Sequence, residues 1–343
     1  MTAELRIDLD AFADNLAAIR NRVAPAAHML VVKDDAYGHG LEAIVTRAWA
    51  EDVRWFGAFD VRTGSAVRAF LGAEARIFVW IVATAEEARA AVDADLDIGV
   101  GDAALLEDVA AASGRGRVHL KIDTGLHRNG VRPEEWPGFV ARAAELERDG
   151  ALEVVGVWSH IAEASDAEDD AARTLFDAAV RQAQDAGLRP VLRHLAASAA
   201  GFARPEFRYD LVRIGAFAYG IRPAGGPGEA ELGIRPVSTL AAHVARVDGE
   251  DVTIDVGGLD GLPSTLAGRL EVGTIQGSRA VRVIGLSEST VAGWSTAQVG
   301  DEVLVLGAGA PASVTDAAER IGTIGEEIAL RFSPGMPRVY RGG

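Results

Sequence analysis

Lysine is rare in this chain, and its two occurrences suggest amine chemistry. The sequence has 34 basic residues, of which only Lys33 and Lys121 are lysines. Arginine therefore serves almost every position that carries a positive charge. A lysine amine can lose its proton and attack a carbonyl carbon, which a guanidinium cannot do. The two lysines are therefore candidates for chemistry on a carbonyl group, with chance retention as the alternative.

Further basic and hydroxyl residues lie at or just after the ends of predicted strands. In a barrel of alternating strands and helices, reactive side chains gather at the carboxyl ends of the strands. Such a cluster on an acidic protein indicates a site for an anionic ligand. Taken singly, His194 could be a buried structural histidine and Arg213 could pair with a carboxylate. The residues are Lys33, Lys121, Arg128, His160, His194, Ser198 and Arg213.

Eight apolar runs alternate with helical patterns over roughly the first 200 residues. A helical pattern begins at Asp10, a plausible N-cap. The order predicts an α/β fold, a (β/α)8 barrel of the TIM type, with a doubly wound sheet as the second choice. No GxGxxG motif follows the first strand, which disfavours a dinucleotide-binding version of that second choice. The runs are 28–33, 55–59, 76–82, 97–100, 117–123, 153–159, 191–196 and 210–215, and helical patterns include 40–51, 133–149 and 169–186.

The pattern changes near residue 220. Residues 220–228 are rich in glycine and proline and predict a connection between domains. Beyond them, β-rich segments cover 237–247, 252–256, 279–285 and 302–306, and one or two helices are expected over 315–330. We therefore predict a barrel domain over residues 1–222 and a C-terminal β-domain over 223–343, to which the first few residues are a candidate addition.

Composition excludes several classes of function. The formal net charge of −16 disfavours binding to nucleic acid and to anionic membranes. The chain has no cysteine, so disulfides, thiolate metal sites and a cysteine nucleophile are excluded, and no metal site is predicted. The longest apolar run, 77–83, is too short to span a bilayer, and the charged N-terminus has no apolar signal segment. We expect a cytoplasmic protein.

Five motifs in order resemble those of the bacterial alanine racemases. They read VVKDDAYGHG at 31–40, KIDTGLHRNG at 121–130, SHIA at 159–162, HLAASAA at 194–200 and VRIGAFAYG at 212–220. The segments RIGTI at 320–324 and PRVY at 337–340 are similar to the closing segments of that family. The resemblance covers essentially the whole chain. It implies a pyridoxal 5′-phosphate-dependent isomerase of D-amino acid metabolism, with a (β/α)8 barrel, a C-terminal β-domain and a homodimeric state.

The resemblance also implies how the cofactor is bound. Lys33 would form the Schiff base with pyridoxal phosphate and act as the base on one face of the substrate Cα. Tyr37, Ser198 and the backbone amides of Gly215 and Ala216 would hold the phosphate, a task suited to neutral donors.

Five further residues would tune the ring and orient the substrate. Arg213 would face the pyridine nitrogen and keep it unprotonated, which weakens the ring as an electron sink. His160 would lie beside the ring, and His194 would orient Arg213. Arg128 would reach the phenolic oxygen and the substrate carboxylate. Lys121 resembles the lysine that is carbamylated in this family to support that arginine.

The β-domain differs from the family pattern at the second base. Racemisation needs a proton-transfer group on each face of Cα, and the resemblance assigns the second to a β-domain tyrosine. The four tyrosines here are Tyr37, Tyr209, Tyr219 and Tyr340, and none falls in that segment. Glu326 stands where the family has another tyrosine near the phosphate.

Three functional hypotheses therefore stay open. The first is a racemase of alanine or a related amino acid with a substitute second base. The second is a one-base pyridoxal phosphate enzyme acting on another amino acid. The third is a pyridoxal phosphate-binding protein without catalysis. The candidate substitutes for the second base are His243, Asp255, Asp260 and Glu288.

Overall fold

The computed structural model describes residues 3–163 and 165–342, which form two compact units. The barrel unit consists of residues 19–33 and 48–215. The β unit consists of residues 34–47 and the described parts of residues 1–18 and 216–343.

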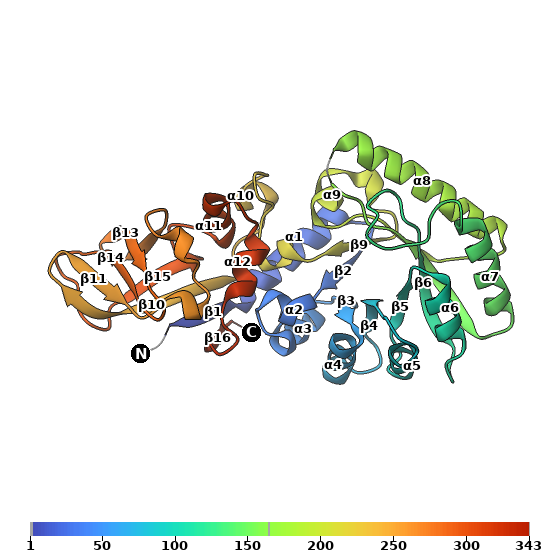
Figure 1. The fold of residues 1–343 in the computed structure, drawn as a ribbon, viewed down its shortest axis with the longest axis horizontal. Coiled ribbons are helices and arrows are strands. Elements are labelled where there is room, and N and C mark those ends of the chain that lie inside the picture. Colours follow the sequence, from blue (N-terminus) through green and yellow to red (C-terminus); the bar gives the residue numbers. More distant parts are fainter. Residues whose placement is uncertain (1–2, 164, 343) are drawn as a thin grey trace. The chain divides into compact units, whose positions relative to one another are not determined.

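The barrel unit contains eight parallel strands in the order β8-β7-β6-β5-β4-β3-β2-β9 (Figure 1). Each strand from β3 to β8 lies beside the one before it in sequence, which confirms the barrel and rules out the doubly wound sheet. Between β8 and β9 the structure closes through backbone hydrogen bonds from Asp210 to Arg193 (3.2 Å) and from Arg213 to Ala196 (3.3 Å). The strands are β2 (Ala27–Val31), β3 (Trp55–Asp60), β4 (Arg76–Ile81), β5 (Asp97–Val100), β6 (Gly116–Lys121), β7 (Leu152–Trp158), β8 (Leu192–His194) and β9 (Leu211–Ile214).

Helices follow the strands, and α4, α5, α6 and α8 start at side-chain caps. Thr84 and Asp102, for example, accept hydrogen bonds from backbone amides in the first turns of α5 and α6. In Figure 1, α4 to α7 line the outer side of the barrel strands. The helices are α4 (Val61–Leu71), α5 (Ala85–Asp93), α6 (Ala103–Ala110), α7 (Trp136–Arg148), α8 (Asp166–Asp185) and α9 (Ser198–Ala203), with a 3-10 turn η1 (Pro205–Phe207). Helix α3 (Leu41–Ala50) belongs to the β unit up to residue 47 and to the barrel unit from residue 48.

The first helix starts slightly earlier than predicted. Helix α1 spans Leu9–Val23, so Asp10 lies inside it and is not its N-cap. Asp8 takes that place, because its carboxylate accepts a hydrogen bond of 2.8 Å from the Ala11 amide.

Aromatic and aliphatic side chains fill the barrel interior. Met29, Phe78, Trp158 and Leu211 form a buried cluster. Two fully buried histidines, His119 and His194, lie among these apolar residues. Buried polar groups are normally hydrogen-bonded, and the partners of these two rings lie in the candidate active site.

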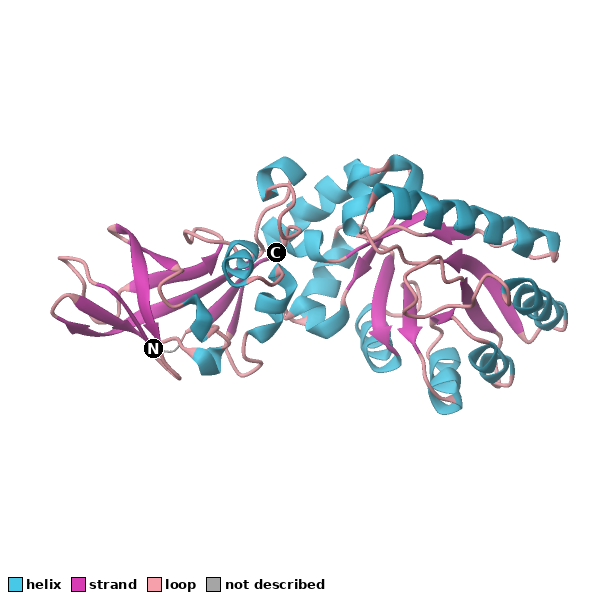
Figure 2. Ribbon diagram, turned by 45° about the horizontal axis from the view of Figure 1, so that its top comes forward, coloured by secondary structure: helices cyan, strands magenta, loops and turns pink. Residues whose placement is uncertain are grey.

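The β unit is built on a second eight-stranded sheet, in the order β11-β14-β13-β12-β15-β10-β1-β16. Figure 2 shows its strands, like those of the barrel unit, in magenta. Strand β1 pairs antiparallel with β10 and parallel with β16. The predicted late helical segment is two helices, because Gly322 ends the first in a left-handed conformation (φ 73°). Helix α2 (Lys33–Tyr37) belongs to the β unit except for its first residue, Lys33, which belongs to the barrel unit. The other elements are β1 (Glu4–Asp8), η2 (Ala216–Tyr219), α10 (Glu229–Leu232), β10 (Ser238–Asp248), β11 (Asp251–Ile254), η3 (Gly258–Asp260), η4 (Ser264–Leu266), β12 (Glu271–Thr274), β13 (Gly277–Ile284), β14 (Ser289–Ala292), β15 (Glu302–Gly307), α11 (Val314–Ile321), α12 (Gly325–Arg331) and β16 (Arg338–Arg341).

Within the described part of the chain, no helix combines the length and apolar character needed to cross a membrane.

Candidate active site

The barrel unit brings most of the predicted site residues to the carboxyl ends of its strands. Lys33 follows β2, Lys121 ends β6, and His160 follows β7. His194 ends β8, and Arg213 lies in β9. Because parallel strands of a barrel end on one face, these side chains share that face, as the sequence predicts.

Arg213 is a buried cation held by neutral groups. Its Nη1 donates to His194 Nδ1 (2.9 Å), and its Nη2 donates to the carbonyls of Ser159 and Leu195 (2.8 Å each). Nη2 also lies 3.2 Å from His160 Nδ1. None of these contacts uses Nε, which leaves that donor for a ligand. Burial lowers the pKa of Arg213 to about 9, so the group stays cationic at neutral pH.

Lys121 is also buried in the barrel. Its Nζ lies 4.5 Å from the centre of the Trp158 ring. Burial, together with the charges of Arg128 and Arg213 and against the opposing effect of Asp123, lowers the pKa of Lys121 to about 8. A larger share of this amine is therefore neutral near physiological pH than for an exposed lysine, as reaction with an electrophile requires.

The positive charges converge on His160. Burial lowers the pKa of His160 to about 3, and four cations contribute in the same direction. His160 is therefore neutral. A ring surrounded by cations marks a place suited to a polyanionic ligand, and a phosphate together with a phenolate meets that description. The four cations are Arg213, Arg128, Lys121 and Lys33.

Two predicted phosphate ligands lie together in the barrel unit. Ser198 begins α9, and its Oγ accepts a long hydrogen bond of 3.4 Å from the Gly215 amide. Nearby, a Glu163 carboxylate oxygen accepts a hydrogen bond of 2.9 Å from the Ala200 amide. Burial raises the pKa of Glu163. An acidic side chain thus already binds one amide of the segment that also carries Ser198.

The turn after Lys33 is strained. Asp34, Asp35, Ala36 and Tyr37 all have φ near +54°, a conformation that costs about 1–2 kcal/mol for each residue other than glycine. Such strain persists only where the surrounding structure enforces it.

Strand β16 supplies that enforcement within the β unit. Arg338 Nε donates to the Gly38 carbonyl (2.8 Å), and the Tyr340 hydroxyl donates to the His39 carbonyl (3.1 Å). Arg338 Nη2 also lies 3.3 Å from a carboxylate oxygen of Asp35. The turn that follows Lys33 is therefore held by residues from the far end of the sequence.

Tyr37 and Ala216, the other predicted phosphate ligands, belong to the β unit. The Tyr37 ring packs against Tyr219, with ring centres 4.8 Å apart. Burial raises the pKa of Tyr37, and the negative charge of Glu326 adds to the effect. Glu326 thus acts electrostatically on a residue expected to bind phosphate.

The four predicted substitutes for the second base lie in the β unit, where both aspartates accept backbone hydrogen bonds and the buried His243 Nδ1 has no hydrogen-bond partner among the described residues. The Asp255 carboxylate accepts from the His243 amide (2.6 Å), and His243 Nδ1 lies 3.8 Å from the other Asp255 oxygen. Asp260 accepts from the Gly257 amide (2.8 Å). Glu288 lies 3.8 Å from Arg246.

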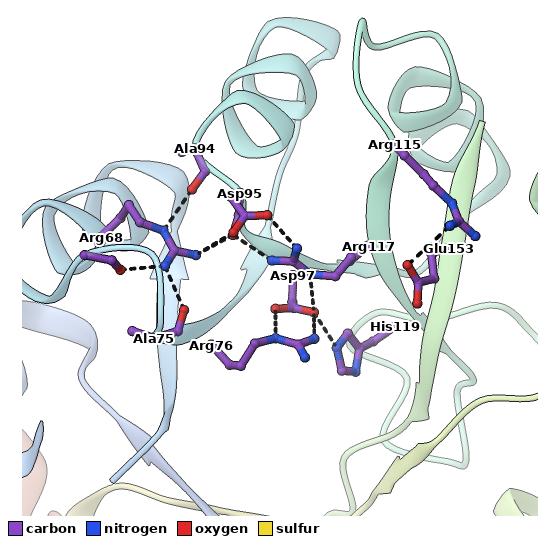
Figure 3. A network of polar contacts seen from close by, with 11 residues as sticks. Arg68, Ala75, Arg76, Ala94, Asp95, Asp97, Arg115, Arg117, His119 and Glu153 are labelled. Atoms are coloured by element: carbon purple, nitrogen blue, oxygen red, sulfur yellow. Dashed lines mark hydrogen bonds and ion pairs between the residues drawn. The ribbon is translucent and has the colours of Figure 1, made fainter. Parts of the chain in front are cut away.

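Sequence reasoning missed a polar network inside the barrel unit that includes Asp97 and His119 (Figure 3). His119 Nδ1 lies 2.9 Å from His194 Nε2, and so contacts a predicted site residue directly. The sequence did contain a signal for this network: Asp97 lies in the predicted strand 97–100, and His119 lies in the predicted strand 117–123. Within the part of the chain that the structure describes, no group of three His, Asp or Glu residues could hold a metal ion.

Comparison with known proteins agrees with this geometry. Residues 7–223 match the family described as "Alanine racemase, N-terminal domain". The alanine racemase of Beutenbergia cavernae is 36% identical, over 98% of this chain and 97% of its own length. That of Thermobifida fusca is 34% identical, over 99% and 98%.

Solved structures give the same result. The alanine racemase of Streptomyces coelicolor A3(2) is 34% identical and superposes with a TM-score of 0.94, over 100% of this chain and 98% of its own. The alanine racemase of D-cycloserine-producing Streptomyces lavendulae is 32% identical, with a TM-score of 0.93 and the same coverage.

Proposed function

The chain belongs to the alanine racemase family, and from this premise we propose that it is a pyridoxal phosphate-dependent racemase. The reaction would interconvert the L and D forms of alanine or of a related amino acid. The observation that carries the proposal is the convergence of Lys33, Lys121, Arg128 and Arg213 on His160. This charge pattern suits a cofactor with a phosphate and a phenolate, and Lys33 supplies the amine that such a cofactor needs.

The residues present fit the cofactor. The Gly215 amide and the Ser198 hydroxyl, together with Tyr37 and the Ala216 amide, would hold the phosphate. Arg213 would direct a fixed positive charge at the pyridine nitrogen and keep that nitrogen free of a proton. Arg128 would bind the phenolic oxygen and the substrate carboxylate, with Lys121 in support. His160 would lie against the ring as a neutral group, oriented by Arg213.

Lys33 would hold the cofactor and move the proton on one face of the substrate Cα. When bound, the cofactor withdraws electrons from Cα and so makes its proton removable. The Lys33 amine then takes that proton or returns one on the same face. The strained turn beginning at Asp34 restricts the backbone directly after this lysine.

The opposite face needs a second group. Tyr340 holds the His39 carbonyl, Tyr209 donates to Asp177 (2.8 Å), and Tyr219 is 1% exposed. This engagement of the tyrosines favours, as a second candidate function, one-base chemistry on another amino acid.

We also propose a homodimer in the cytoplasm, without nucleic acid or membrane partners.

The test is proton NMR in D2O, with the cofactor added and L- or D-alanine supplied separately, followed by chiral analysis. We expect loss of the α-proton from both enantiomers together with their interconversion. Exchange without interconversion would instead indicate one-base chemistry. If bound cofactor gave no exchange with alanine or with larger amino acids, the racemase proposal would be wrong.

The control variant is Lys33→Ala. It should lose all cofactor-dependent exchange, because the amine that would both attach the cofactor and move the near-face proton is removed. Exchange that survives in this variant with bound cofactor would refute the assignment of Lys33.

A further inference from the structure

A chain of buried polar side chains crosses the interior of the barrel unit. It runs from Arg213 to His194 (Nη1 to Nδ1, 2.9 Å) and from His194 to His119 (Nε2 to Nδ1, 2.9 Å). It continues from His119 Nε2 to Asp97 Oδ1, 3.5 Å away. The four side chains come from β9, β8, β6 and β5, and each residue is at most 5% exposed. Nothing in the proposed function so far uses His119 or Asp97.

Arg213 fixes the direction of this chain, because a guanidinium can only donate. His194 Nδ1 must therefore accept, so the proton of the neutral ring lies on Nε2. That proton is donated to His119 Nδ1, which leaves the His119 proton on Nε2, facing Asp97. Burial lowers the pKa of both rings, so both are neutral. The opposite tautomer at either ring would place two protons or two lone pairs face to face.

Asp97 anchors the far end of the chain (Figure 3). Its carboxylate accepts from Arg76 Nε (3.0 Å) and Nη2 (2.5 Å), and from Arg117 Nε (3.2 Å). Burial opposes ionisation, but the nearby His119 ring, 3.5 Å away, and the hydrogen-bonded Arg76 guanidinium hold the pKa of Asp97 well below its usual range. The chain therefore ends on a permanent acceptor, matching the permanent donor at Arg213.

The surrounding residues leave the two rings little freedom. The Phe78 ring lies 4.8 Å from that of His119 and 5.3 Å from that of His194, centre to centre. The Trp158 ring stacks on His194 at 5.7 Å. A Cβ on Gly156 would lie 2.4 Å from His119 Nδ1, so the backbone of β7 leaves space for that ring only as glycine.

We propose that Asp97 and His119 are positioning residues for Arg213, acting by fixing the tautomer and orientation of His194. Arg213 then presents its guanidinium to the pyridine nitrogen in one orientation, and among the described residues no carboxylate hydrogen-bonds to it. The role of Arg213 towards that nitrogen rests on the proposed function. The tautomers of the two histidines, in contrast, follow from the contacts within the protein and do not depend on its function. A fixed cation there disfavours protonation of the cofactor ring, and with it the side reactions that a stronger electron sink permits.

The first test is long-range 1H–15N NMR of the histidine rings in the cofactor-free protein. We expect the Nε2–H tautomer at both His119 and His194. A protonated Nδ1 on either ring, or a doubly protonated ring, would overturn the proposal. This experiment needs no variant and no catalysis. Its result can therefore contradict the tautomer assignment while the racemase proposal stands, and the racemase proposal can be wrong while the tautomer assignment stands.

The second test uses Asp97→Asn, with Asp95→Asn as its matched control. The Asp95 carboxylate accepts hydrogen bonds from Arg68 Nη2 (3.4 Å) and Arg117 Nη1 (2.5 Å) in the same network, and no dashed line joins it to His119 in Figure 3. We expect Asp97→Asn to shift the ring signals of His119 and His194 and to lower kcat about tenfold, with less change in KM. The ratio of transamination to racemisation should rise, and Asp95→Asn should change none of these. Equal behaviour of the two variants would overturn the proposal. Should Asp97→Asn not fold, His119→Gln takes its place with the same expected outcomes for His194, kcat and the transamination ratio.

Discussion

The charge state of single buried residues decides what the barrel site can bind. Arg213 keeps its proton because its pKa stays near 9, and His160 stays neutral because its pKa falls to about 3. Lys121 lies between these cases, since its pKa of about 8 is close to the pH of a cell. It is therefore the site residue whose protonation responds most to ordinary conditions.

Lys121 should make folding stability depend on pH. Its pKa is lowered from 10.5 to about 8 in the folded chain. Between these values the unfolded state binds more protons, so stability rises with pH across this window, and the penalty is fully present below pH 8. Lys121→Met removes the group. We expect the free energy of unfolding of the natural chain to rise by about 2–3 kcal/mol relative to that of Lys121→Met between pH 7 and pH 10.

Urea unfolding of both proteins in CO2-free buffer measures this difference. Added bicarbonate provides a second comparison, because a carbamate on Lys121 would remove the buried cation. Bicarbonate should then stabilise the natural chain at pH 7 and leave Lys121→Met unchanged. A difference between the two proteins that is independent of pH would show that Lys121 is not buried as a cation.

Site residues could be predicted from the sequence where their type is unusual or their motif is known. Lys33 and Lys121 stand out in a chain whose other basic residues are all arginine. His119 and Asp97 do not, because a histidine in one strand and an aspartate in another carry no sign of their contact. Their contact depends on the register between β5 and β6, in which Asp97 lies opposite Arg117 and His119 lies opposite Gly99, and on which side of the strands each side chain takes.

At the level of elements, the eight barrel strands were predictable because Val, Ile and Leu fill their buried positions. The short strands of the β unit were harder. Strands β12 and β14 have four residues each, and β16 is largely polar, so their pairing partners decide their conformation. The boundary between residues 222 and 223 stays a prediction.

Glycine at position 156 should be required by strand β7. A Cβ there would meet His119 Nδ1 at 2.4 Å, so Gly156→Ala must displace a ring held between aromatic neighbours. We expect a loss of stability of about 1–3 kcal/mol, typical of overpacking.

The control is Gly138→Ala in helix α7, where a Cβ would meet nothing within 4 Å. Alanine favours a helix over glycine by about 0.5–1 kcal/mol, so this variant should be more stable than the natural chain. Denaturant unfolding compares the two. A neutral Gly156→Ala would mean that His119 can move, and that the polar chain through the barrel tolerates displacement.

For the molecule as a whole, the scarcity of lysine makes cofactor attachment simple to map. The chain offers two ε-amines, Lys33 and Lys121, and Lys121 is packed against Trp158. After incubation with pyridoxal phosphate and borohydride reduction, mass spectrometry should find the pyridoxyl group on the Lys33 peptide alone. Label on the Lys121 peptide would contradict the proposed binding site.

The hydrogen bonds from β16 to the turn after Lys33 also have a consequence for biosynthesis. Arg338 and Gly38, which form one of them, are 300 residues apart. A ribosome adds roughly 5–20 residues each second, so the turn waits about 15–60 seconds for its partners after it is made. Until then, nothing from β16 offsets the strain of four left-handed residues. A nascent chain whose barrel strands are already complete therefore still lacks the contacts that hold the turn after Lys33, and it gains them only as synthesis ends.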